Sequence, residues 1–384
     1  MHAEAVCAVR GLGRMAAWRA HAYAAPQELR LDAARVPPLR APSDVRVRVH
    51  QTSLNPLDVA MTGGYGSRVL NTLRALEGGE GVEFPLVPGR DFVGEVAEAG
   101  PGARLRPGSR VWGVVPPHRP GAHADYVVLD QRWVGPAPAA LGAAAGGALF
   151  AALSASAALR AAGVWGAAGR GARVLLLGLG GVGHAALQLL TYHGAQVVVG
   201  SAGEQSETAR ALGAVAALDR HAADYPQALE LAGPYDAIID CAGLGGDEAG
   251  ARRWRFKRFV TLTTPLLRET DARGLVAGGV VAAAQLAAQC LSAASGAWSG
   301  AGSGAWSGAG SAPACPPHVR WAYFVPRADD IELLRRLAER GEFTVAVERV
   351  FPWRAARAAY ERAARGRARG KLLLDFTDDG PGGA

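Results

Sequence analysis

Arg173-Val174-Leu175-Leu176-Leu177-Gly178-Leu179-Gly180-Gly181-Val182-Gly183 is the stretch that decides the fold. Its apolar run predicts a parallel strand that is buried on both faces. The glycines match G-x-G-x-x-G at the point where a strand turns into a helix, which is the context that gives this motif meaning. The first glycine makes a tight turn, the second admits a pyrophosphate and the third lets the helix pack on the strand. The predicted dinucleotide site comprises Gly178, Gly180, Gly181, Val182 and Gly183.

A βαβ rhythm continues from this turn toward the C-terminus. The pattern predicts a helix over 182–193, followed by strands at 196–199, 236–240 and 258–262. Alternating strands and helices indicate a doubly wound parallel sheet, here a Rossmann domain assigned to residues 139–344. The predicted cofactor site also includes Cys241 and Leu262.

The end of the second strand decides between NAD and NADP. NAD sites place Asp or Glu there to accept from the ribose hydroxyls. This strand ends at Ser201, whose hydroxyl can donate to a 2′-phosphate, and Arg220 lies nearby in the sequence to supply positive charge. Glu204 is the opposing feature. The balance predicts NADPH as the cofactor.

The N-terminal part has a different texture. Alternating or apolar runs at 45–49, 92–96, 110–115 and 125–129 predict short strands separated by Pro/Gly turns. Closely spaced strands with few helices indicate a β-barrel-like domain over 15–138. The preceding residues, 1–14, contain two arginines and resemble a short organelle-targeting segment, although an unstructured tail fits equally well.

Metal ligands are scarce in this barrel part. Residues 15–139 contain no cysteine, and their histidines show no ligand spacing; they are His21, His50, His118 and His123. Zinc dehydrogenases need a Cys/His/acid set for the catalytic metal. We therefore expect no metal, and expect either hydrogen-bond donors or the cofactor's own geometry to polarise the substrate.

Charge and hydropathy exclude some classes of function. The net charge is +7, and acids and bases are mixed through most of the chain, which argues against a nucleic-acid partner. The most apolar stretch, 274–291, is rich in Ala and Gly and is predicted to be a buried helix rather than a membrane span. An exact tandem duplication at 296–311 predicts a flexible loop insertion over 294–314.

Three further segments carry a family resemblance: 53–58, 64–66 and 88–94. They resemble the non-zinc, quinone-oxidoreductase branch of the medium-chain dehydrogenases/reductases, and the likeness runs from Met15 through nearly the whole chain. Within that branch, the segments 55–66, 320–324 and 365–371 resemble the mitochondrial reticulon-interacting oxidoreductases. Two features depart from the branch: the glycine loop is one residue shorter than usual, and the duplication precedes the 320–324 motif.

The resemblance implies a GroES-like barrel that is completed by residues 345–378, and a mitochondrial NADPH enzyme connected with ubiquinone biosynthesis. It implies that Tyr323 and the loop of Arg367, Ala368 and Arg369 lie beside the nicotinamide; the composition alone predicts a solvated basic face there. Asn55 and Tyr65 would border the substrate, although Asn55 equally fits a helix cap before Pro56, and Tyr65 a packing role.

Three functions remain open from the sequence. The first is hydride transfer from NADPH to a quinone or enone. The second is a non-catalytic NADPH-binding partner of another enzyme or of a reticulon-type membrane protein, because no acid/base constellation stands out. The third is an enoyl-thioester reductase.

Overall fold

The computed structural model describes residues 13–78, 83–299, 316–366 and 368–377. The possible targeting segment falls almost wholly outside these residues, as do Arg367 and most of the duplicated insertion. The chain divides into two compact units, Met1–Leu153 with Pro326–Ala384, and Ser154–Val325. The texture of the sequence suggested boundaries near 138 and 344 instead; α11, Ala328–Glu339, falls in the first unit.

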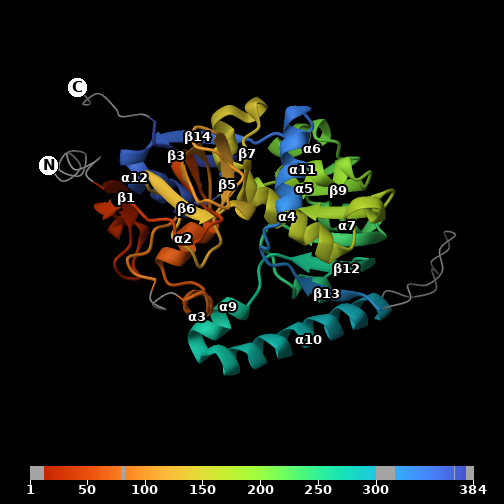
Figure 1. Cartoon of the computed structure of the whole chain (residues 1–384). Helices are drawn as coiled ribbons and strands as arrows, with labels where there is room; N and C mark the ends of the chain where they lie inside the picture. The colour runs from red at the N-terminus through yellow and green to blue at the C-terminus, as the bar shows by residue number, and fades with distance from the viewer. Residues whose placement is uncertain (1–12, 79–82, 300–315, 367, 378–384) are drawn as a thin grey trace. The chain divides into compact units, whose positions relative to one another are not determined.

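The first unit is built on mostly antiparallel strands, with β14 parallel to β15 (Figure 1). In its described part, seven strands form one sheet: β14-β15-β3-β4-β5-β7 in order, with β6 also paired to β3. β1 and β2 form a separate pair. The strands are β1 (Arg14–Arg19), β2 (Arg30–Arg35), β3 (Asp44–Leu54), β4 (Asp91–Ala99), β5 (Arg110–Val114), β6 (Tyr126–Asp130), β7 (Val134–Pro136), β14 (Val347–Pro352) and β15 (Lys371–Asp375).

Short helices lie between these strands. They are η1 (Pro26–Glu28), α2 (Pro56–Thr62), α3 (Ser67–Leu76), η2 (Gln131–Trp133), η3 (Ala139–Gly147), η6 (Trp353–Ala355) and α12 (Ala356–Ala364). β3 alternates between buried and less buried residues, as its Val-x-Val pattern predicts. β3 pairs antiparallel with β15, so the C-terminal segment completes the GroES-like sheet.

The second unit is a Rossmann sheet. Among the described residues, six parallel strands follow the order β10-β9-β8-β11-β12-β13. In chain order this is 3-2-1-4-5-6, the dinucleotide-binding topology, whose switch point lies between β8 and β11. The strands are β8 (Arg173–Leu177), β9 (Gln196–Ser201), β10 (Ala216–Asp219), β11 (Tyr235–Asp240), β12 (Phe256–Thr261) and β13 (His318–Trp321).

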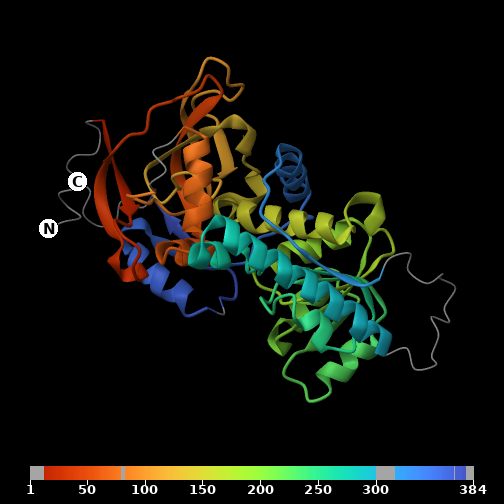
Figure 2. The ribbon, with the colours of Figure 1, turned by 90° about the horizontal axis from the view of Figure 1, so that it is seen from below.

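The helices of this unit differ widely in length. They are η4 (Gly166–Gly169), α5 (Gly181–Tyr192), η5 (Gly203–Gln205), α6 (Ser206–Ala211), α7 (Tyr225–Leu231), α8 (Glu248–Ala251), α9 (Leu266–Arg273) and α10 (Leu275–Ser299); α4 (Leu149–Ala162) crosses the boundary between the units. α9 and α10 follow one another with a turn at Gly274, and Figure 2 shows them in the foreground from below.

One prediction about this unit is wrong. The apolar stretch 274–291 forms a helix, α10, but the helix is not buried. An 18-residue window within Leu275–Ser295 has a mean hydropathy of 1.6, and only 17% of that window is buried. By length and composition this is the one helix among the described residues that is able to span a membrane alone, which is weak grounds because core helices pass the same test. The periodicity alone did not show that the apolar residues face outward.

Candidate functional site

The glycine turn has the geometry that a pyrophosphate site requires. Gly178 has a φ of +88°, a conformation that favours glycine. A Cβ on Gly183 would lie 2.0 Å from the carbonyl oxygen of Gly178, so only glycine lets α5 begin this close to β8. A Cβ on Gly180 would instead meet nothing within 4 Å. The backbone thus borders open space at the N-terminus of α5, where N–H groups and the helix dipole favour a phosphate.

The loop after β11 lies against this turn. The backbone N–H of Cys241 donates to the carbonyl oxygen of Leu177 at 2.9 Å, and a Cβ on Gly178 would lie 3.0 Å from Ala242. Buried Asp240 holds the loop, because its carboxylate accepts hydrogen bonds from the backbone N–H groups of residues 242–245. Burial raises the pKa of the Cys241 thiol, which therefore stays protonated at neutral pH.

The other predicted cofactor residues of this unit follow the carboxyl ends of neighbouring strands. Ser201 ends β9 and is 2% exposed, and its carbonyl oxygen accepts from the backbone N–H of Arg220 at 2.8 Å. Leu262 follows β12. Tyr323 follows β13, is 41% exposed and contacts the Thr264 side chain. Parallel topology thus brings these positions to one edge of the sheet, the edge at which α/β proteins bind ligands.

A feature that the sequence analysis did not weigh lies at the same edge. Asp219 ends β10 opposite Ser201. A Cβ on Gly203 would lie 2.5 Å from an oxygen of the Asp219 carboxylate, so this acid faces the loop that follows β9. The sequence rule did not find Asp219, because that rule looks for an acid at the end of the second strand and Asp219 ends the third.

In the first unit, Asn55 belongs to a buried polar cluster. It is the N-cap residue of α2, as the sequence alternative proposed, and its backbone N–H donates to Asp58 at 2.9 Å. Its side chain is committed elsewhere: Nδ2 donates to Asp91 Oδ1 at 3.1 Å and to Ser53 Oγ at 3.2 Å, while Oδ1 accepts from Lys371 Nζ at 2.6 Å. The amide is therefore held in one orientation.

Lys371, the first residue of β15, is not among the site residues predicted from the sequence. The structure leaves it 7% exposed, with its stem packed beside Gly147. A buried ammonium needs acceptors, and Asn55 supplies one. No local pattern pairs two residues 316 positions apart, so sequence reasoning missed this contact.

Tyr65 lies in the turn between α2 and α3 and is partly buried. Its backbone N–H donates to the carbonyl oxygen of Ala60 at 3.1 Å. In the C-terminal loop, the backbone N–H of Arg369 donates to Glu348 at 2.6 Å, and Arg362 makes two hydrogen bonds to the same carboxylate. Arg362 thus supports the loop that contains Ala368 and Arg369, rather than serving only as a solvated helix face.

The Gly89-Arg90-Asp91 segment holds a buried cation. Arg90 is fully buried, with Nε 3.3 Å from Asp58 Oδ1. Its remaining donors reach the carbonyl oxygens of Val87, Pro116, Pro117 and Arg119. Every charge here is matched by protein groups. Within the residues that the structure describes, no group of three or more His, Cys, Asp or Glu side chains is arranged to hold a metal ion.

His123 completes this region. Nε2 lies 3.0 Å from the carbonyl oxygen of Ser53, which can only accept, so Nε2 carries the proton. Nδ1 then accepts from the Tyr360 hydroxyl at 3.1 Å. Burial lowers the pKa of His123, which agrees with a neutral ring in this arrangement.

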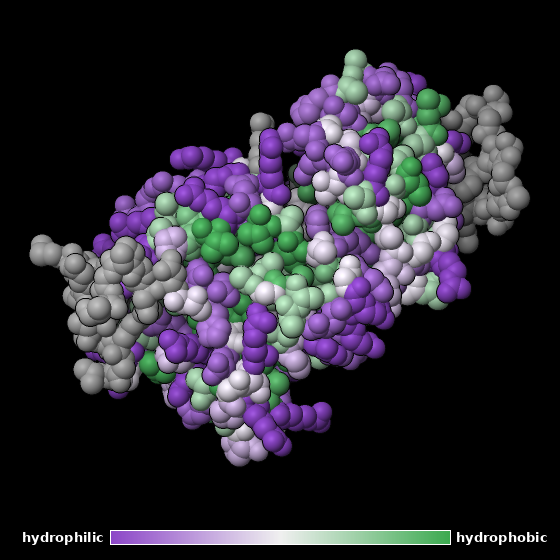
Figure 3. Space-filling view, turned by 90° about the horizontal axis from the view of Figure 1, so that it is seen from above, coloured by the Kyte–Doolittle hydropathy of each residue, from purple (hydrophilic) through white to green (hydrophobic). Residues whose placement is uncertain are grey.

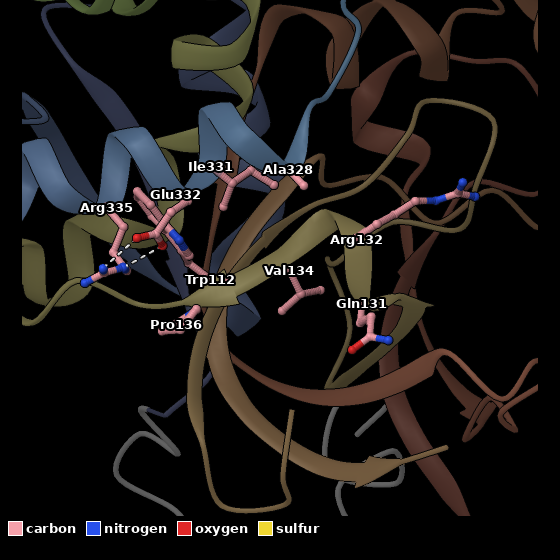
Figure 4. A pocket seen from close by; sticks show the side chains of 10 residues that line it. Trp112, Gln131, Arg132, Val134, Pro136, Ala328, Ile331, Glu332 and Arg335 are labelled. Atoms are coloured by element: carbon pink, nitrogen blue, oxygen red, sulfur yellow. Dashed lines mark hydrogen bonds and ion pairs between the residues drawn. The ribbon is translucent and has the colours of Figure 1, made fainter. Parts of the chain in front are cut away.

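A separate hollow lies between β7 and α11 in the same unit (Figure 4). It has a volume of about 170 Å³, an apolar lining that includes Val134 and Ile331, and a Glu332–Arg335 ion pair at its rim. None of the predicted site residues lines it. Its volume is also below the roughly 300 Å³ at which small-molecule pockets begin.

Comparison with known proteins identifies the family. Residues 41–139 match the family described as Alcohol dehydrogenase GroES-like domain, and residues 212–374 match Zinc-binding dehydrogenase. The NAD(P)H oxidoreductase RTN4IP1, mitochondrial, of Drosophila melanogaster is 33% identical over 95% of this chain and 87% of its own. Reticulon-4-interacting protein 1, mitochondrial, of Caenorhabditis elegans is 30% identical over 89% of this chain and 90% of its own.

Solved structures agree on the fold. The quinone oxidoreductase from Coxiella burnetii aligns with a TM-score of 0.69 at 23% identity, covering 94% of this chain and 99% of that one. The predicted family and the two-domain α/β fold are confirmed. The chain therefore belongs to the medium-chain dehydrogenase/reductase superfamily, in its quinone oxidoreductase-like branch, and to the family of NAD(P)H oxidoreductases that the fly protein represents.

Proposed function

We propose that this chain is an NADPH-dependent, zinc-independent oxidoreductase that reduces a quinone or conjugated carbonyl. The observation that carries the proposal is the glycine turn at the switch point, where Gly180 borders open space and Ser201, not an acid, ends β9. When bound, NADPH supplies a hydride. The remaining roles fall to residues of this chain.

On the cofactor side, the N–H groups at the start of α5 bind the pyrophosphate, and Ser201 with Arg220 receives the 2′-phosphate. Cys241, Leu262, Tyr323 and the loop of Arg367, Ala368 and Arg369 line the nicotinamide end. On the substrate side, Lys371 orients the Asn55 amide by its 2.6 Å hydrogen bond, and Asn55 and Tyr65 border the substrate. The buried Arg90 and Asp58 side chains neutralise one another's charge without a metal ion.

Calorimetric titration with NADPH and NADH tests the cofactor preference. We expect NADPH to bind more tightly, and we expect Ser201→Asp to invert the preference because a carboxylate repels the 2′-phosphate. Asp219→Asn is the matched variant. It removes the carboxylate that faces the loop after β9, and it is expected to leave NADPH preferred. Equal binding of the two cofactors by the wild type contradicts the proposal.

The C-terminal loop is tested in the same titration. We expect Arg369→Ala to weaken NADPH binding by about tenfold or more, the size of a charge-assisted contact. Arg365→Ala is the control, because Arg365 is exposed, whereas Arg362 supports the loop through Glu348. An unchanged dissociation constant for Arg369→Ala removes this loop from the site.

Turnover separates the substrate classes. NADPH oxidation is followed with a quinone, an enone and an enoyl thioester, before and after prolonged chelation. We expect the quinone or enone to be reduced and the activity to survive chelation. NADPH binding without any turnover favours the non-catalytic partner, and turnover of the thioester alone favours the lipid-synthesis enzyme.

We further propose that the protein works in mitochondria and supports ubiquinone biosynthesis, with a reticulon-type membrane protein or an enzyme of that process as partner. The mitochondrial names of the fly and nematode relatives support the proposed location, and the reticulon-interacting name of the nematode relative supports the proposed partner. Fractionation of cells, with measurement of ubiquinone content after deletion of the gene, tests it. Unchanged ubiquinone in the deleted cells contradicts the biosynthetic role.

A further inference from the structure

Lys371 is an unusual residue in this chain, both by its type and by its place. The sequence has 41 lysine and arginine residues, and only Lys257 and Lys371 are lysines. Hydrophilic side chains are common on the surface, as the purple groups in Figure 3 show, and water solvates them there. Lys371 is instead 7% exposed, whereas the side chain of Lys257 is 44% exposed. A lysine therefore occupies a buried position in a protein that otherwise uses arginine almost throughout.

The sheet of the first unit brings Lys371 to Asn55. β15 pairs antiparallel with β3, and Leu372 lies opposite Leu54. The next residues along the two strands are Lys371 and Asn55, whose side chains meet where the pairing ends. A Cβ on Gly147 would lie 3.2 Å from Cβ and Cε of Lys371, so the glycine leaves room for the lysine stem. Strand pairing and close packing thus hold the ammonium group in a fixed place.

Of this pair, only Lys371 has hydrogen-bond donors that are not already used. Both N–H groups of the Asn55 amide are committed, to Asp91 and to Ser53, so Asn55 cannot donate to a substrate. An ammonium group has three N–H donors. Among the described residues, Asn55 Oδ1 is the one hydrogen-bond acceptor of Nζ, and no carboxylate forms an ion pair with it. Two donors of a buried cation are therefore left for a further acceptor.

Asp91 compensates the charge of Lys371 without contacting it. Its carboxylate accepts hydrogen bonds from Ser53, from Asn55 Nδ2 and from the backbone N–H of Phe150. Donation by Nδ2 to a carboxylate makes Oδ1 a better acceptor for the ammonium, because hydrogen bonds in a chain polarise one another. Asn55 is therefore a positioning residue, which fixes the lysine and leaves its remaining donors available.

We propose that Lys371 is the proton donor of the reaction; this inference rests on the proposed reduction of a quinone or enone by NADPH. When the substrate has accepted a hydride, and with it two electrons, its oxygen carries a negative charge. The Nζ–H bond then breaks and an O–H bond forms on that oxygen, which gives the hydroquinone or the enol. The neutral amine takes a proton from water. Each turnover thus consumes one NADPH and one proton.

Proton donation explains why a lysine fits this position and an arginine does not. A guanidinium group is not deprotonated in proteins, whereas a lysine ammonium gives up its proton readily when it is buried. A well-placed proton donor typically accelerates a reaction by about a hundredfold to ten thousandfold. The cation beside Asn55 is of the type that is able to supply this acceleration.

Steady-state turnover of a quinone or an enone by the full chain tests the proposal. Lys371→Met keeps most of the stem and removes the ammonium group. We expect kcat to fall by about a hundredfold or more, while the dissociation constant of NADPH stays unchanged. Lys257→Met is the matched control, because it removes the other lysine of the chain and should leave kcat unchanged. Melting curves of each variant establish that it folds.

Added cations separate proton transfer from other roles of the lysine. In Lys371→Ala, ethylammonium should restore part of kcat, because it brings a transferable proton into the space that the stem leaves. Guanidinium carries the same charge without a transferable proton and should restore nothing. A lysine needed only for structure would be rescued by neither cation, and one needed only for its charge would be rescued by both. Either result overturns the proposal.

A binding measurement that needs no turnover completes the test. With lysine labelled by carbon-13 at Cε, the chain gives two side-chain signals, and Lys257→Arg identifies them. We expect 4-nitrophenolate, which resembles the oxygen anion of a reduced quinone, to shift the Lys371 signal and not the Lys257 signal. An unshifted Lys371 signal, or an active enzyme whose Lys371→Met variant keeps full kcat, overturns this inference alone. A wild type that binds NADPH and reduces neither substrate overturns the proposed function, and this inference with it.

Discussion

α5 and α10 belong to the same unit and have similar composition, since neither contains Asp, Glu, Lys or Arg. Yet α5 buries Leu187, Leu189 and Leu190 completely, whereas α10 leaves Val276, Val280 and Leu291 mostly exposed. α5 lies against β8 and β9, and the glycine turn joins β8 to α5. α10 contacts α8, α9 and the edge strand β13. Apolar composition thus indicates that a helix face is to be covered, and does not say by what.

Placing a carboxylate on each helix gives the largest expected contrast. Leu187→Asp on α5 should destabilise the protein by at least about 3 kcal/mol, because a charge would be buried without a partner. Val280→Asp on α10 should change the stability of the monomer by no more than about 0.5 kcal/mol. Urea unfolding at low protein concentration measures both. Comparable losses would mean that α10 is as much a core helix as α5.

Valine at an uncrowded glycine sharpens the comparison at the level of ligand binding. A Cβ meets nothing within 4 Å at Gly180, before α5, or at Gly279, on α10. We expect Gly180→Val to weaken NADPH binding by more than about tenfold with little change in Tm, because its side chain fills the pyrophosphate space. Gly279→Val should leave NADPH binding unchanged. Full affinity in the Gly180 variant would place the phosphates elsewhere.

Lowering the pH should reduce stability through α5 and not through α10. This is the smallest of the three expected effects. Burial lowers the pKa of His184 on α5. Because its folded pKa lies below the unfolded value of about 6.5, stability is complete above that pH and falls as pH drops through the folded pKa. One such group changes stability by at most about 1.4 kcal/mol per pH unit.

His184→Gln should therefore reduce the loss of Tm between pH 7.5 and pH 5, as measured by calorimetry. The pKa of buried His123 is lowered too, so part of the acid sensitivity should persist. A Tm profile identical to that of the wild type would show that His184 is protonated without cost.

Local signals in the sequence determined the Rossmann core and its glycine turn. Four predicted strands of the second unit appear within two residues at either end, as β8, β9, β11 and β12. They were predictable because an apolar run, and a glycine needed at positive φ, act within a few residues. The predicted strands of the barrel appear as β3, β4, β5 and β6, but β3 and β4 run five and three residues beyond their predicted C-terminal ends. The resemblance supplied the family.

Tertiary structure alone decided the rest. The hydrogen bond between Asn55 and Lys371 joins residues 316 positions apart, and that between His123 and Tyr360 joins residues 237 apart. Such pairs leave no periodic pattern in the sequence, because the two residues come together only when the sheet has formed. The outward face of α10 was hidden for a related reason: composition shows how much apolar surface a helix has, whereas long-range contacts, such as those of Gln289 with Asp247 and Trp321, show which side faces the protein.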